Sequence, residues 1–399
     1  MLGLALEGGG SRGAYHLGVY RAYTQQGFHF DMITGTSIGA VNAAVLAQGD
    51  AARLEEAWKT LNNSDIFDVD NERYRRLFSL KLEIADFSYY RDTLSKVASG
   101  GGVDTAKMVS LIDRLVDSDR LLASPVDFGL VTVCTSDLKP VEFFKHDIPK
   151  EDLKTYIMAS ATFPGFQPTM IDGKPYIDGG LYDNCPMTML AAKGCDEIIA
   201  VRTYGPGVFR LPKEKDLKIT VIEPSQPLGP IMNFDPQVSA ENIKMGYYDA
   251  LRRLQTLAGR LYYIRRPRQD TAFEAFCRLQ EEQIGRACAV SGFGSQMPPR
   301  RALFEKLLPA LAAELEVSKE SDYTDLLIAM LENRALRAEI DRFAIFELQD
   351  FFTAVCAAKA APPPRKPLNL PSLRRRLLTA SDLLLEELLS LSGSPLLLS

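Results

Sequence analysis

Short apolar runs alternate with helical patterns through the first half of the chain. The runs are bounded by glycine, proline or charged residues, which is typical of buried strands. They lie at 4–6, 32–34, 128–135, 141–144, 176–177, 197–202 and 218–222. Helical patterns follow the first two runs, over 14–26 and 38–47. This alternation predicts an α/β fold with a mostly parallel central sheet covered by helices on both faces.

From about residue 261 the pattern becomes helical, with little strand signal. Helical periodicity covers 273–289, 299–316, 321–336 and 340–356. A helix within 223–260 closes the first region, through Ile243, Tyr247, Leu251 and Leu254. We therefore predict two domains, an α/β domain over 1–260 and a C-terminal α-helical domain over 261–399.

The second domain ends in an amphipathic leucine-rich tail. Three prolines at 362–364 precede three arginines at 374–376 and a series of leucines up to Leu391. A basic cluster before an amphipathic helix suits peripheral contact with an anionic membrane surface. The same leucines would equally suit docking on the helical domain or pairing with a second copy, and the sequence leaves these interpretations open.

Residues 50–125 interrupt the strand and helix alternation. They hold Trp58 and then, among charges, Tyr74, Phe78, Phe87, Tyr89 and Tyr90, followed by the glycine run 100–102. We interpret this stretch as a helical insertion with a glycine hinge, serving either as a cover over a site or as ordinary scaffold.

Composition narrows the classes of function. A formal net charge of −5 argues against a nucleic-acid partner. The six cysteines are scattered without metal-ligand spacing, so we expect neither a metal nor a cofactor. The amino terminus lacks a signal-like segment and no apolar run is long enough to span a bilayer, so we expect a cytoplasmic protein, with or without peripheral membrane contact.

A glycine-rich turn, Gly8-Gly9-Gly10-Ser11-Arg12-Gly13, closes the first strand. At a strand-to-helix junction such a turn points backbone N–H groups into one concavity, which suits an anion. The turn also satisfies the dinucleotide pattern G-x-G-x-x-G, so a nucleotide- or phosphate-binding protein is an alternative. That alternative requires an acid at the end of the second strand, whereas Asp31 precedes it.

Ser37 stands at the second strand-to-helix junction, in Gly35-Thr36-Ser37-Ile38-Gly39. A nucleophile elbow holds its serine in a strained conformation, and only small residues fit two positions before and after it. Gly35 and Gly39 are those residues, and an alanine-rich helix comes after them. The pattern predicts a serine nucleophile beside the glycine turn, as in an acyl hydrolase.

The base that would activate Ser37 is less obvious. The chain has only three histidines, His16, His29 and His146, and none stands where an α/β-hydrolase triad would place it. A Ser-His-Asp triad is therefore disfavoured. The chain instead offers Asp178-Gly179-Gly180, an aspartate on a tight turn that another backbone can approach closely.

These motifs, in this order, resemble those of the patatin-like phospholipases over about residues 2–250. The stretches 159–164 and 166–168 resemble the family's turn before the aspartate, and 182–186 resembles the family's segment after the aspartate. The resemblance implies a three-layer patatin-like fold and a dyad in which Ser37 is the nucleophile and Asp178 the base. It also implies a phospholipid or lysophospholipid ester as substrate, and a catalytically silent relative is a further alternative.

The resemblance also assigns the residues around the dyad. The N–H groups of Gly8, Gly9, Gly10 and Ile38 are expected to form the oxyanion hole, with Gly13, Gly35, Gly39, Gly179 and Gly180 supporting the motifs. Arg12 either lends positive charge to this hole or to a lipid phosphate, or bonds to nearby carbonyls as a helix-end residue. A base at neutral pH requires a raised pKa, so we expect Asp178 to be buried.

Overall fold

The protein is described here from a computed structural model that covers residues 1–67, 102–137, 139–214, 216–267, 270–293, 297–363 and 373–391. The chain forms two compact units, Met1–Leu251 and Arg252–Ser399. Along the sequence, the boundary between the two units falls slightly before residue 260, where we predicted it. Most of the expected insertion, including Tyr74 to Tyr90 and the start of its glycine hinge, lies outside the described residues.

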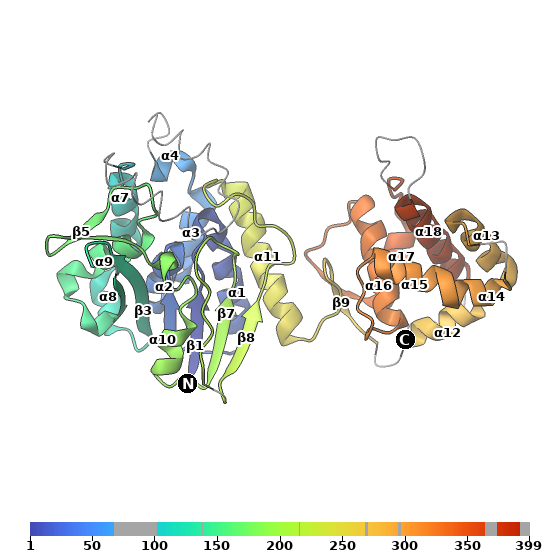
Figure 1. Ribbon diagram of the computed structural model, residues 1–399, viewed down its shortest axis with the longest axis horizontal. Helices are drawn as coiled ribbons and strands as arrows, with labels where there is room; N and C mark the ends of the chain where they lie inside the picture. The colour runs from blue at the N-terminus through green and yellow to red at the C-terminus, as the bar shows by residue number, and fades with distance from the viewer. Residues whose placement is uncertain are drawn as a thin grey trace. The chain divides into compact units, whose positions relative to one another are not determined.

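The first unit is built on a mixed, mostly parallel sheet of eight strands (Figure 1). The strands are β1 Leu2–Leu6, β2 Met32–Gly35, β3 Asp127–Cys134, β4 Lys139–Phe144, β5 Thr169–Ile171, β6 Lys174–Asp178, β7 Glu197–Val201 and β8 Lys218–Ile222. Their order is β5-β6-β3-β2-β1-β7-β8, with β4 paired to β3. The central pairs are parallel, whereas β4, β5 and β6 pair antiparallel. All seven predicted strands are confirmed, and β5 is the strand of this sheet that was missed.

Helices surround this sheet. They are α1 Ala14–Gln25, α2 Ile38–Ala47, α3 Ala51–Thr60, α4 Asn63–Ile66, α7 Ala106–Leu115, α8 Ser118–Ala123, α9 Leu153–Ala161, α10 Met187–Ala192 and α11 Pro236–Leu254, with the short 3-10 turns η1 Gly10–Gly13, η2 Lys145–Asp147, η3 Lys150–Asp152 and η4 Gly179–Leu181. The predicted helix 38–47 is α2 itself. Ala5 and Thr34 pair across β1 and β2 and face α10, where the Thr34 hydroxyl donates to the Pro186 carbonyl at 2.9 Å. Side chains alternate along strands, so Leu4 and Ile33 face the opposite side, against α2. The predicted α/β class, with helices on both faces, is confirmed.

The second unit is helical, with one small parallel pair of strands. Its elements are β9 Tyr263–Arg265, α12 Thr271–Arg278, α13 Glu281–Ser291, α14 Pro299–Ala302, the π-helical turn η5 Leu303–Leu307, α15 Leu308–Glu314, α16 Tyr323–Arg337, β10 Ile345–Glu347, α17 Leu348–Ala357 and α18 Leu373–Leu391. Two expectations were wrong in detail. The helix expected over 273–289 breaks at Leu279, whose backbone is extended before Gln280 caps α13. The helix expected from Ile340 begins at Leu348, after β10.

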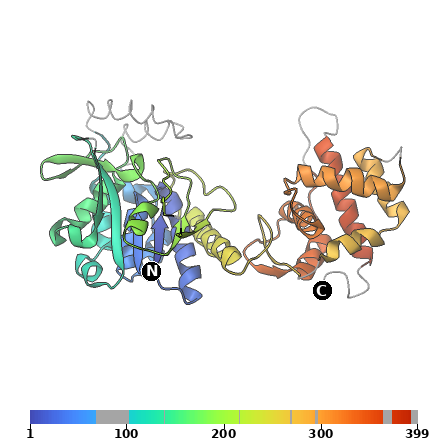
Figure 2. The ribbon, with the colours of Figure 1, turned by 60° about the horizontal axis from the view of Figure 1, so that its bottom comes forward.

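The tail helix α18 packs inside the second unit. Figure 2 shows it passing among the other helices of that unit. Its apolar face is buried in their common core, through Leu377, Ala380, Leu384, Leu385 and Leu388. Arg374, from the basic cluster, pairs with Glu314 of α15 at 3.0 Å. In the structure these leucines are docked on the helical domain, and peripheral membrane contact stays a prediction.

A buried glutamate ties the start of the second unit to α16. Glu332 is 4% exposed. Its carboxylate accepts hydrogen bonds from the backbone N–H groups of Leu261 and Tyr262, both at 2.8 Å, and of Arg260 at 3.2 Å. Three donors replace the water that this carboxylate loses on burial, which makes it a stable structural link.

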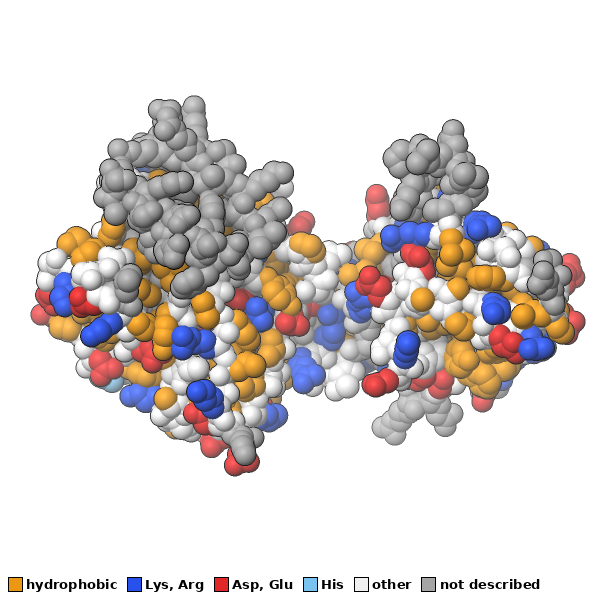
Figure 3. Space-filling view, viewed as in Figure 1, with side chains coloured by type: hydrophobic (Ala, Val, Ile, Leu, Met, Phe, Trp, Pro, Cys, Tyr) orange, Lys and Arg blue, Asp and Glu red, His pale blue; other side chains and the backbone are white. Residues whose placement is uncertain are grey.

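On the face seen in Figure 3, Lys and Arg side chains lie among Asp and Glu side chains. Among the described helices, none is both long and apolar enough to cross a membrane.

Candidate active site

Strand β3 brings Ser37 and Asp178 together. One edge of β3 is occupied by β4 over residues 129–134. The other edge is shared: β2 pairs with its first half and β6 with its second half. Gly35, at the end of β2, lies opposite Leu130, and Asp178, at the end of β6, lies opposite Thr132. The two strands therefore run toward each other, and the side chains at and just beyond their ends meet.

The backbone at Ser37 has the strained conformation of an elbow. Its φ of 59° and ψ of −132° lie where side-chain-bearing residues rarely occur. A Cβ at Gly35 would lie 2.2 Å from the Gly39 carbonyl oxygen, and a Cβ at Gly39 would lie 2.3 Å from the Leu6 carbonyl oxygen. The turn is therefore as tight as the size argument expects. The Ser37 N–H donates to the Ser160 hydroxyl at 3.1 Å.

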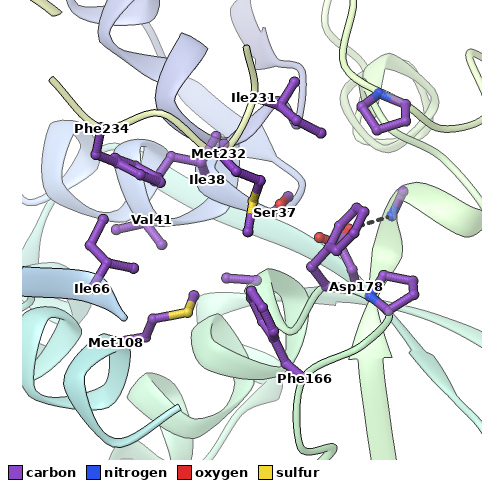
Figure 4. A pocket seen from close by; sticks show the side chains of 18 of the residues that line it. Ser37, Ile38, Val41, Ile66, Met108, Phe166, Asp178, Ile231, Met232 and Phe234 are labelled. Atoms are coloured by element: carbon purple, nitrogen blue, oxygen red, sulfur yellow. Dashed lines mark hydrogen bonds between the residues drawn. The ribbon is translucent and has the colours of Figure 1, made fainter. Parts of the chain in front are cut away.

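Asp178 is buried, with 4% of its surface exposed. Its carboxylate accepts a hydrogen bond from the Gly180 N–H at 2.8 Å, drawn as a dashed line in Figure 4. Burial raises the pKa of Asp178 to about 6, against the opposing effect of hydrogen bonds from the Ser37 side chain and the Gly180 N–H. A carboxylate with this pKa is both ionised and usefully basic at neutral pH.

The two side chains face an apolar cavity that is open to solvent at its mouth. Figure 4 shows apolar side chains around Ser37 and Asp178 from several elements. The apolar residues that line it include Ile38, Val41, Ile66, Phe67, Met108, Leu111, Ile112, Phe163, Phe166, Ile231, Met232 and Phe234. Asn184 is the other polar side chain in the described part of the lining. Such a cavity suits a hydrocarbon chain attached to a polar group.

The glycine turn borders the same cavity, but its three N–H groups are not equivalent. The Gly8 N–H donates to the Asn184 carbonyl at 2.9 Å. The structure therefore corrects our expectation for Gly8, because its donor is already engaged. For the N–H groups of Gly9, Gly10 and Ile38, no acceptor occurs in the described ranges. Gly10 has a φ of 57°, and a Cβ there would lie 1.9 Å from the Ile231 carbonyl oxygen.

The family model of patatin-like phospholipases matches residues 4–191. Residues 4–191 thus carry a patatin-like phospholipase domain. This match includes the glycine turn, the Ser37 elbow and Asp178, and it confirms the resemblance seen in the sequence.

Curated relatives match across the patatin-like domain and beyond it. "Lysophospholipase NTE1" of Saccharomyces cerevisiae is 25% identical over 293 residues, which cover 70% of this chain and 16% of that protein. An uncharacterized NTE family protein of Mycobacterium tuberculosis is 29% identical over 213 residues, 51% of this chain and 31% of that protein. The chain thus spans well under half the length of these relatives.

Among solved structures, VipD from Legionella pneumophila aligns with a TM-score of 0.41 and 15% identity, over 98% of this chain and 92% of that one. We draw no functional conclusion from a likeness at this level.

Arg12 of the patatin-like domain bonds to carbonyl oxygens. Its Nε donates to Gly229 at 2.7 Å, and its NH1 group donates to Tyr204 at 2.7 Å and to Thr203 at 3.2 Å. Arg12 does not line the cavity. Of the two interpretations of Arg12, the structure supports the second, in which it ties the glycine turn to two neighbouring segments.

All three histidines fall within the described part of the patatin-like domain, and none lines the cavity. His16 is fully buried beside Asn42, and burial lowers its pKa to about 3. His29 and His146 are exposed. Among the described residues, no group of three His, Cys, Asp or Glu side chains could hold a metal ion.

Sequence reasoning missed several residues of this site. Ser160 lies in the recognised stretch 159–164, but nothing in the sequence indicated that its hydroxyl contacts Ser37. Asn184 donates to the Gly8 and Gly205 carbonyls, both at 3.3 Å. The cavity wall at Ile231 comes from a distant segment that carries no local signal.

Proposed function

We propose that this protein is a serine acyl hydrolase that cleaves fatty-acyl esters of phospholipids or lysophospholipids. One observation carries the proposal: Ser37, on a strained elbow at the end of β2, and the buried Asp178, at the end of β6, face the same apolar cavity. The two groups have the roles that a Ser-Asp dyad requires, a hydroxyl and a base whose pKa lies near the working pH.

In the proposed reaction, the Ser37 oxygen attacks the ester carbonyl while its proton passes to Asp178. Protonated Asp178 then gives this proton to the leaving alcohol as the carbonyl–oxygen bond breaks, which leaves an acyl-enzyme. Water attacks the acyl-enzyme, Asp178 accepts a proton from it, and the fatty acid leaves as Ser37 regains its hydrogen.

The oxyanion formed in both steps would accept hydrogen bonds from the N–H groups of Gly9, Gly10 and Ile38. Ile38 begins α2, so its N–H lacks an acceptor within the helix, and the positive end of the helix dipole adds to it. Each such donor contributes about 3 kcal/mol to transition-state stabilisation in comparable sites.

A lipid substrate is supported by the apolar cavity and by the name of the yeast relative, a lysophospholipase. An acyl chain fits a cavity whose described lining is almost free of polar side chains. Peripheral contact with the membrane that holds the substrate, and a cytoplasmic location, remain predictions.

The dyad is tested by comparing hydrolysis of a short-chain aryl ester and of a lysophospholipid by wild type, Ser37→Ala and Asp178→Asn. We expect both variants to lose at least about 1,000-fold in kcat/KM. Asp183→Asn is the matched control: Asp183 is also buried and its pKa is raised to about 7, but it does not line the cavity. Its hydrolysis rate should stay near that of wild type.

Equal rates in wild type and both dyad variants would reject the proposal. Thermal stabilisation of the inactive protein by a nucleotide would then favour a phosphate-binding role for the glycine turn. Absence of both activities would favour a catalytically silent relative.

A further inference from the structure

We propose that Ser160, at the end of α9, is a positioning residue that fixes the orientation of Ser37. The inference rests on the proposed function and concerns a residue outside the dyad and the oxyanion hole. Ser160 is fully buried, and its hydroxyl oxygen accepts the Ser37 N–H at 3.1 Å.

The contact lies on the amino-terminal side of the elbow, where the Thr36 carbonyl also accepts the Gly39 N–H at 2.8 Å. The Ser37 carbonyl is anchored by the first turn of α2, where it accepts from the N–H of Ala40 at 2.9 Å and of Val41 at 3.4 Å. The Ser37 N–H has Ser160 as its acceptor among the described residues. Strained backbone conformations persist only where the surroundings determine them, so the bond to Ser160 opposes rotation of the elbow toward a relaxed geometry.

The same end of α9 also holds the other member of the dyad. The Asp178 N–H donates to the Thr162 carbonyl at 2.8 Å. Residues 160–162 therefore contact the backbone of both Ser37 and Asp178, while Ala161 between them lines the cavity. We therefore infer that the stretch 159–164, whose role the sequence did not reveal, holds the backbones of both Ser37 and Asp178 in place.

The neighbouring hydroxyl provides a matched control. Thr162 is also fully buried, and its hydroxyl bonds to the Met158 carbonyl at 2.8 Å and to the Thr169 hydroxyl at 2.7 Å. Its contact with Asp178 uses the backbone carbonyl, which a side-chain substitution leaves in place. Thr162→Val therefore removes a buried hydroxyl from the same helix end without removing either dyad contact.

The experiment compares wild type, Ser160→Ala, Ser160→Cys and Thr162→Val in two assays. One separates kcat from KM for aryl-ester hydrolysis. The other measures the rate at which a fluorophosphonate reacts with Ser37, where an oxygen–phosphorus bond forms and fluoride leaves. The second assay reports the orientation of Ser37 without a lipid substrate.

We expect Ser160→Ala to lower both kcat and the labelling rate by about 10- to 100-fold, because a small misplacement of a reacting atom has effects of this size. KM should change less than about twofold, since the cavity wall is unaltered. Ser160→Cys, whose sulfur is a weaker acceptor, should lie between wild type and Ser160→Ala. Thr162→Val should stay within about twofold of wild type in both assays, whatever it does to the melting temperature.

Losses no larger in Ser160→Ala and Ser160→Cys than in Thr162→Val would overturn the inference. If Ser160→Ala fails to fold, the labelling rate of Ser160→Cys decides between the two outcomes. Failure of the proposed function has a different signature: hydrolysis and labelling would then persist in Ser37→Ala.

Discussion

Two buried carboxylates, one in each unit of the chain, have opposite surroundings. Glu332 of the helical unit accepts three backbone N–H groups. Asp178 of the α/β unit, equally buried, accepts one backbone N–H, and it borders an apolar cavity. Burial alone thus does not distinguish a reactive acid from a structural one, because the number of donors around it decides which state of the carboxyl group is stabilised.

The two units also differ in how their apolar side chains are packed. In the helical unit they interdigitate with α18 into a closed core. In the α/β unit a set of them instead surrounds empty space beside Ser37. An open apolar cavity of this kind is expected to lower the stability of the fold, whereas the Glu332 link is expected to raise it.

The largest effect should come from removing the structural acid. Glu332→Ala leaves three buried N–H groups without an acceptor, so we expect the helical unit to lose about 3–5 kcal/mol of unfolding free energy. Urea denaturation followed by circular dichroism measures this loss. The exposed Glu320→Ala is the control, with a change below about 0.5 kcal/mol. Similar unfolding free energies for Glu332→Ala and Glu320→Ala would contradict a stabilising role for Glu332.

The reactive acid should behave in the opposite way. The folded-state pKa of Asp178, about 6, lies above its ordinary value of 3.8. Its contribution to stability is therefore fully present below pH 3.8 and is lost as the pH rises through 6. Asp178→Asn cannot ionise, so we expect it to exceed wild type by about 2–3 kcal/mol at pH 7.5.

Denaturation curves at several pH values measure this gain. The difference between wild type and Asp178→Asn should shrink toward zero as the pH falls to about 4. A variant less stable than wild type at pH 7.5 would show that the ionised carboxylate is stabilised in the fold.

The same titration should appear in the reaction rate. Because Asp178 acts as a base only when ionised, kcat/KM should fall by about tenfold per pH unit below pH 6 and level off above it. The profile of Glu332→Ala should have the same midpoint. A wild-type profile that stays flat between pH 5 and 8 would contradict Asp178 as the base.

We expect the smallest effect from substitutions of Arg12, whose guanidinium group donates hydrogen bonds to backbone carbonyls. Arg12→Lys keeps the charge but loses the planar fork of donors, whereas Arg12→Met loses both. We expect each to lower stability by about 1 kcal/mol and hydrolysis by less than about tenfold. Full activity in Arg12→Lys beside a large loss in Arg12→Met would show that the charge itself acts on the substrate.

Much of the α/β unit was predictable because its signals are local. Strands buried on both faces are apolar throughout, and helix α2 is bounded by the elbow before it and Gly49 after it. The three-residue β5 gave no signal, since it is too short for a pattern. In the helical unit, Leu279 is apolar and in phase with the helices around it, so the break there depends on tertiary packing.

The candidate site was predictable only where glycines mark it. Gly35 and Gly39 are required by contacts within the elbow itself, so the sequence around Ser37 carries their signal. The engagement of the Gly8 N–H depends on Asn184, and the support for Ser37 depends on Ser160. Both are contacts across the fold, which a single sequence does not record.

The segment 229–231 has a consequence for how such an enzyme changes its selectivity. Ser11 donates to the Ile231 carbonyl from its N–H and to the Pro230 carbonyl from its hydroxyl, both at 2.8 Å, and Arg12 holds Gly229. Ile231 also lines the cavity beside Gly9 and Gly10. These hydrogen bonds link the cavity wall at Ile231 directly to the glycine turn, so a shift of one segment is expected to shift the other. If the proposed function holds, a substitution that reshapes the wall for another acyl chain would also move the proposed oxyanion donors. Substrate preference and turnover would then change together, and transferring either property to another protein would require both segments.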